Sequence, residues 1–166
     1  MTLKPQDIVV LLLVASLGDR DWTYAQLAES TGLSTSQVHR SLQRAAGADL
    51  FAAARRAVHK RNLLEFLSHG IRYAFPAVVG PRQRGVPTAH SAPPLSEQVA
   101  GLPVAVWPAA HGEATGDAVQ PLHSAALTIS MESPAVYELL ALVDAVRVGR
   151  ARDRAIAIQL LAERLQ

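Results

Sequence analysis

The residues best suited to chemistry lie between positions 34 and 46, where hydrogen-bonding side chains occur without any acid. At 3.6-residue spacing Val38 and Leu42 point inward, so the polar side chains between them face outward. Arginine and glutamine in such a row can bond base edges or phosphates in a DNA groove. We predict base contacts from one group and phosphate contacts from another: Ser36, Gln37, Arg40 and Gln43 for bases, and Thr35, His39, Arg44, Arg55, Arg56 and Lys60 for phosphates.

Two helices joined by a short turn must position these side chains. Thr23 with Gln26, and Ser34 with Gln37, each have the spacing of a capping box, and Gly32 stands where a left-handed residue is needed. Leu27, Ala28 and Leu33 complete the inward positions. The pattern predicts a helix-turn-helix over residues 23–44, with a second helix at about 34–46. The same hairpin can also serve packing alone or bind a protein.

Charge is distributed unevenly along the chain although the net charge is only +2. Residues 34–85 carry nine Lys or Arg against two acids, whereas residues 86–146 carry six acids and no Lys or Arg. A basic surface of this kind releases counterions from DNA, and binding then weakens steeply with salt. The alternative is a scattered, solvated set of charges.

Composition limits the class of protein. A chain of 166 residues with 49% hydrophobic content can bury a real core, and it has no cysteine for disulfides or thiol chemistry. The apolar run from Ile8 to Val14 is too short to span a bilayer and lacks the flanks of a secretion signal, so we expect a buried first helix over 5–17, no membrane and a cytoplasmic location.

No pattern of residues indicates catalysis. The six histidines form no i, i+4 pair and have no cysteine companions, and no Walker loop, dinucleotide fingerprint or nucleophile elbow occurs. We therefore predict no enzymatic activity, no metal and no cofactor.

The remaining segments predict a mainly α fold with three parts. Residues 1–76 form a winged helix-turn-helix domain whose wing is reduced, because Ala52, Ala53 and Ala54 favour helix and the usual Gly or Asn turn is missing, leaving a short loop with two arginines. A helical pattern follows at 61–74. Residues 77–132 form a Pro-rich segment. We expect residues 79–94 to be an ordered loop rather than a flexible tether between domains, and we expect short strands near 103–107 and 113–122. Residues 133–166 form a helical hairpin, for core closure or dimerisation, starting at Ser133 and Pro134.

The stretch LAESTGLSTSQVHRSLQR resembles the winged helix-turn-helix transcriptional regulators of bacteria, in the broad group that includes the MarR-like proteins. The likeness covers residues 3–74 and lies in Ala28, Gly32, Leu33, Val38 and Leu42. It implies a sequence-specific regulator that binds double-stranded DNA as a homodimer.

Two other classes remain open. One is a protein-interaction module, such as an antitoxin or adaptor, whose acidic C-terminal half binds a partner protein. The other is a ligand-sensing regulator with a closed apolar pocket, for which the sequence indicates no ligand chemistry.

Overall fold

The computed structural model describes residues 2–166 and confirms a mainly helical chain. The described residues form two compact units. The first unit comprises residues up to 64 together with 122–137 and Leu165, and the second comprises 65–121, 138–164 and Gln166. The chain passes from the first unit to the second within helix α4 (Lys60–His69), returns between residues 121 and 122, and enters the second unit again within helix α7 (Pro134–Val148).

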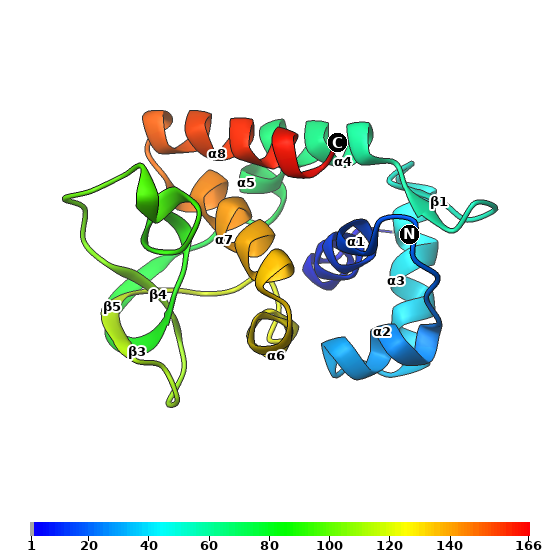
Figure 1. Cartoon of the computed structure of the whole chain (residues 1–166), viewed down its shortest axis with the longest axis horizontal. Coiled ribbons are helices and arrows are strands. Elements are labelled where there is room, and N and C mark those ends of the chain that lie inside the picture. The colour runs from blue at the N-terminus through cyan, green and yellow to red at the C-terminus, as the bar shows by residue number, and fades with distance from the viewer. Residues whose placement is uncertain (1) are drawn as a thin grey trace. The chain divides into compact units, whose positions relative to one another are not determined.

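The first unit is built around α1 (Pro5–Leu17), the predicted first helix. Every residue from Ile8 to Val14 is buried, because α1 is apolar nearly all round and is covered on several sides. Its neighbours include α2 (Tyr24–Thr31), α3 (Thr35–Gly47) and strand β2 (Ala57–Val58). Figure 1 shows α2 and α3 joined by their short turn.

Helix α6 (Ala125–Glu132) also belongs to the first unit, where it packs against α2 and α1. The sequence predicted a loop segment with short strands over 77–132, and the structure corrects this at α6. The segment AALTISME has no clear polar face, so its helical period is weak in the sequence. Its burial through Ala125, Ala126 and Ile129 supplies part of the cover that α1 needs.

The second unit contains a small sheet where the sequence predicted an irregular loop. Residues Val79–Pro87 form strand β3, which pairs antiparallel with β4 (Ala105–Pro108) and with β5 (Ala114–Val119). β4 and β5 pair in parallel, so the three strands close on one another (Figure 1). Pro81 is tolerated because it falls at an irregularity of the β3–β5 register, between Val79 and Arg82. The two later strands were predicted near 103–107 and 113–122; β4 begins two residues later and ends one residue later than predicted, and β5 is shorter.

Three glycines allow this closure because the backbones of the strands touch where they cross. A Cβ atom on Gly85 would overlap the carbonyl group of Trp107, and one on Gly112 would overlap the backbone of Gly85. A Cβ atom on Gly116 would overlap the carbonyl group of Val104. Any larger residue at these positions must push the strands apart.

A buried carboxylate fastens the sheet to α7. Asp144 accepts hydrogen bonds from the Thr88 hydroxyl at 2.8 Å and from the Trp107 indole, and its other oxygen accepts one from Arg147 at 2.8 Å. Arg147 also donates to the carbonyl oxygens of Phe75 and Gln120. Burial raises the pKa of the Asp144 carboxyl, and the charge of Arg147 acts in the opposite direction. No motif in the sequence indicated this network.

The C-terminal part of the chain is the predicted helical hairpin, most of which belongs to the second unit. α7 starts at Pro134, and α8 spans Ala151–Arg164. Arg164 near the end of α8 donates to Glu138 near the start of α7, as expected for antiparallel helices.

The predicted helix at 61–74 is interrupted at Gly70, so that α4 is followed by the short α5 (Ile71–Ala74).

Candidate nucleic-acid interface

The capping residues predicted for the two helices are all in place. Gln26 and Thr23 exchange two hydrogen bonds at the start of α2, and Gln37 and Ser34 do the same at the start of α3. Gly32 ends α2 with a left-handed φ of 74°. The turn between α2 and α3 is therefore fixed by local interactions at both ends.

α3 separates cleanly into a buried and an exposed face. Val38, Ser41, Leu42 and Ala45 are buried, as the predicted period requires. The exposed face carries six of the predicted contact residues: Thr35, Ser36, Gln37, His39, Arg40 and Gln43. Among the residues that the structure describes, none forms an ion pair or a hydrogen bond with the side chain of Arg40, so its guanidinium group is available to a ligand.

Two residues of this face are partly engaged within the protein. The amide oxygen of Gln37 accepts the Ser34 backbone N–H at 2.9 Å, which leaves its NH₂ group as the donor for an outside contact. The His39 ring lies against the edge of Tyr24, with 5.4 Å between ring centroids. Tyr24 was not among the predicted contact residues, and only its place at the start of α2 brings it here.

Arg44 has a different environment from the other predicted phosphate ligands. Its guanidinium group forms two hydrogen bonds with Asp7 of α1, at 2.9 and 2.8 Å. The Asp7 side chain is fully buried and that of Arg44 is 10% exposed. The hydrogen bond to Asp7 is the main reason that the pKa of Arg44 is raised. This pair fastens the end of α3 to the start of α1, and we leave Arg44 out of the candidate interface.

Replacing Arg44 by Ala should therefore lower stability. The variant leaves the buried Asp7 carboxylate without its cation, and we expect a loss of about 3 kcal/mol in the free energy of unfolding. Asp7→Ala should cost less, because Arg44 can turn its charge into solvent. Urea unfolding of both variants measures the difference, and equal losses, or a loss below about 1 kcal/mol for Arg44→Ala, would contradict this structural role.

The segment predicted to be a reduced wing, called the wing segment below, forms two short paired strands rather than a bare loop. Phe51–Ala52 (β1) pairs antiparallel with Ala57–Val58 (β2). The turn between them needs no glycine because Arg56 itself takes a left-handed φ of 52°. Its guanidinium group donates to the Trp22 carbonyl oxygen at 2.8 Å and lies 4.0 Å from the Trp22 ring centroid. These contacts offset the cost of that backbone conformation.

The two arginines of the wing segment are thus not equivalent. Arg55 is exposed, and none of the residues that the structure describes pairs with its side chain. The guanidinium group of Arg56, in contrast, is already hydrogen-bonded to the carbonyl oxygen of Trp22. Lys60 is half-buried at the start of α4.

Between α3 and the wing segment lies a hollow of about 370 Å³. It is lined by Tyr24, His39, Leu42, Gln43, Ala46, Phe51 and Ala53.

Comparison with known proteins identifies no relative. No protein-family model matches the sequence, no curated protein matches it, and no solved structure matches its fold. Over residues 2–166 there is no cluster of three or more metal-ligating side chains, and none of the helices there is long and apolar enough to cross a membrane.

Proposed function

We propose that the chain is a sequence-specific DNA-binding transcriptional regulator and that the first unit acts as a winged helix-turn-helix. The observation that carries this proposal is the exposed face of α3. It consists of hydrogen-bonding side chains without a carboxylate, on a helix whose start is capped and whose end is fastened by Arg44 and Asp7. A rigid helix with this surface is what major-groove recognition requires.

In this mechanism α3 enters the major groove and the wing segment lies along the backbone. Arg40 and Gln43 are one turn apart on the exposed face and bond base edges, with Ser36 and the Gln37 NH₂ group nearer the start of the helix. Thr35, His39, Arg55 and Lys60 bond phosphates. Arg56 contributes mainly by holding the turn of the wing segment against Trp22.

We further propose that the protein binds as a homodimer. One helix reads only a few base pairs, and two copies on half-sites about 34 Å apart would multiply the contacts. The size of the free protein and of its DNA complex, measured by light scattering, tests this part separately. A complex with one chain per duplex would contradict it.

The decisive variant is Arg40→Ala. A bidentate contact of Arg40 to a base pair contributes about 1–3 kcal/mol, so affinity for the preferred site should fall by about 5- to 150-fold. Affinity for scrambled DNA should change much less, because that binding depends on phosphates. The preferred duplex is obtained by selecting genomic fragments on the pure protein, and affinities are measured by fluorescence anisotropy at several salt concentrations.

Two further variants complete this experiment. Arg55→Ala should weaken both duplexes alike and reduce the dependence of affinity on salt by about one ion. Arg152→Ala, an exposed arginine on α8, is the matched control and should change neither. Equal losses on both duplexes for Arg40→Ala would overturn base recognition. Failure of the unmodified protein to retain any DNA would favour the protein-interaction alternative.

A further inference from the structure

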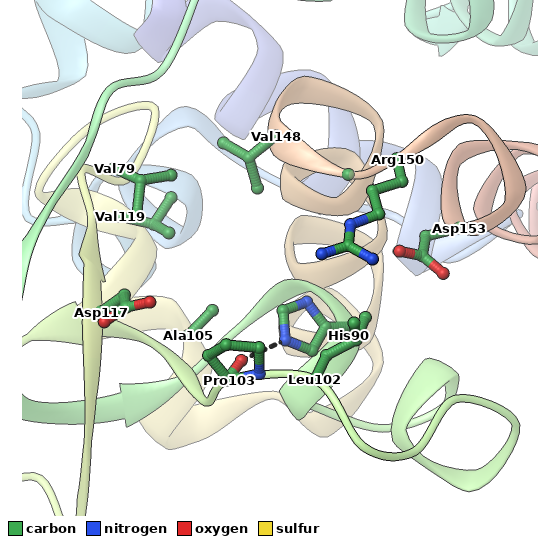
Figure 2. A pocket seen from close by; sticks show the side chains of 11 residues that line it. Val79, His90, Leu102, Pro103, Ala105, Asp117, Val119, Val148, Arg150 and Asp153 are labelled. Carbon is green, nitrogen blue, oxygen red and sulfur yellow. Dashed lines mark hydrogen bonds between the residues drawn. The ribbon is translucent and has the colours of Figure 1, made fainter.

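A cavity of about 250 Å³ in the second unit is lined by charged side chains that have no partners within the protein. Its walls are mainly apolar, and Figure 2 shows Val79 and Val119 on one side and Val148 on another. Leu102, Pro103 and Ala105 close the base. The polar side chains are those of His90, Asp117, Arg150 and Asp153.

Asp153 is the most informative of these residues. It lies in the first turn of α8 and is only 5% exposed. Among the residues that the structure describes, none forms a hydrogen bond or an ion pair with its carboxylate. Its oxygen atoms are nevertheless accessible, because no fully buried side-chain oxygen of the described residues lacks a hydrogen-bond partner. Since Asp153 lines the cavity, a cationic group of a ligand there could bond its carboxylate.

Arg150 provides the opposite charge on the same cavity. Figure 2 shows its guanidinium group turned into the cavity, next to His90 and with the Asp153 carboxylate on its other side. Arg150 and Asp153 nevertheless form no ion pair, and no other residue in the described chain pairs with Arg150. A cation and an anion are therefore presented side by side without neutralising each other.

His90 adds a hydrogen-bond acceptor. Its Nε2 atom bonds the carbonyl oxygen of Pro103, so in the neutral ring the proton lies on Nε2 and Nδ1 has a free lone pair. Asp117 is half-buried on strand β5 at the opposite wall. The polar groups thus comprise one site for an anion and several acceptors for a cationic N–H donor.

We propose that this cavity binds a free α-amino acid with an aliphatic side chain. Its carboxylate would bond Arg150, its ammonium group would bond Asp153, and its side chain would lie among the valines. A zwitterion is the ligand class that uses the charges of Arg150 and Asp153 at once, and Asp117 on the opposite wall is a further acceptor for the ammonium group. A volume of about 250 Å³ leaves room for a molecule the size of leucine or valine.

The test is calorimetric titration of the full chain, without DNA, with L-leucine, L-valine and L-methionine. We expect saturable binding of at least one of them. Two analogues of leucine measure the contribution of each charged group to binding: isoamylamine lacks the carboxylate, and 4-methylpentanoate lacks the ammonium group. Each should bind at least about tenfold more weakly, because each loses one charge-assisted interaction.

Variants then assign the contacts to residues. Arg150→Gln and Asp153→Asn should each weaken amino-acid binding at least about tenfold. Arg152→Gln and Glu163→Gln are the matched controls on α8, lie outside the cavity lining, and should stay within about twofold. Arg150 is exposed, so its substitution should leave the fold intact and keeps the test valid if Asp153→Asn unfolds.

Three results would overturn the proposal. One is the absence of binding by all three amino acids to the folded protein. Another is binding of isoamylamine as tightly as leucine, which would indicate a simple cation site. The third is an Asp153→Asn variant whose stability changes but whose amino-acid binding does not. Asp153 would then act only by stabilising α8 through its charge at the positive, N-terminal end of the helix dipole.

Discussion

Replacing Asp144 by Ala is expected to lower the free energy of unfolding of the second unit by about 3–5 kcal/mol. The variant leaves the guanidinium group of Arg147, whose side chain is 4% exposed, facing a site from which its counter-charge has gone. The Thr88 hydroxyl and the Trp107 indole lose an acceptor as well. Urea unfolding in a Trp22→Phe background follows this unit alone, because the chain has only two tryptophans.

The same helix supplies the control for this prediction. Glu138 pairs with Arg164 at 3.1 Å, but both side chains are about one-third exposed, so Glu138→Gln should cost less than about 1 kcal/mol. The double variant Asp144→Ala with Arg147→Met should be less destabilised than Asp144→Ala alone, since it removes the uncompensated charge. A loss for Asp144→Ala no larger than that for Glu138→Gln would refute the structural role of the network.

Replacing Gly85 by Ala should destabilise the second unit by about 3 kcal/mol, at the upper end of what an inserted methyl group costs. The new Cβ atom would overlap the carbonyl group of Trp107 and would also meet the Cβ atom of Val106. Backbone atoms cannot rotate away as a flexible side chain can, so β3 and β4 must separate. Thermal unfolding followed by circular dichroism measures the loss.

Gly80 on the same strand provides the comparison. A Cβ atom there would lie 3.7 Å from the Cβ of Ala118, which is an ordinary van der Waals contact. Gly80→Ala should therefore be neutral, or should stabilise by about 0.4–1 kcal/mol through the loss of chain entropy in the unfolded state. Similar losses for the two variants would mean that crowding at the strand crossing is not what selects glycine.

The turn between α2 and α3 could be predicted from the sequence because its determinants are local. Each capping box joins residues three apart, and Gly32 acts through its own backbone. The inward positions Leu27, Val38 and Leu42 follow a helical period that needs no knowledge of distant segments. Local patterns of this kind also predicted α7 and α8.

The rest depends on partners far away in the chain. Arg44 has the same side chain as Arg40 and lies one turn later, yet only the position of Asp7, 37 residues earlier, takes it out of the candidate interface. Asp144 receives hydrogen bonds from residues 56 and 37 positions away. β3 contains prolines and glycines that locally indicate a loop, whereas the crossing at Gly85 and the register irregularity at Pro81 depend on strands that come later in the chain.

Since α6 comes from residues 125–132 and covers α1 and α2, the order of synthesis and the order of assembly differ. During translation α1, α2 and α3 leave the ribosome well before the segment that shields their apolar surface. At about 5–20 residues per second that interval lasts several seconds. The nascent chain then presents the aliphatic side chains of α1 to chaperones, and a fragment truncated before residue 122 should be prone to aggregation.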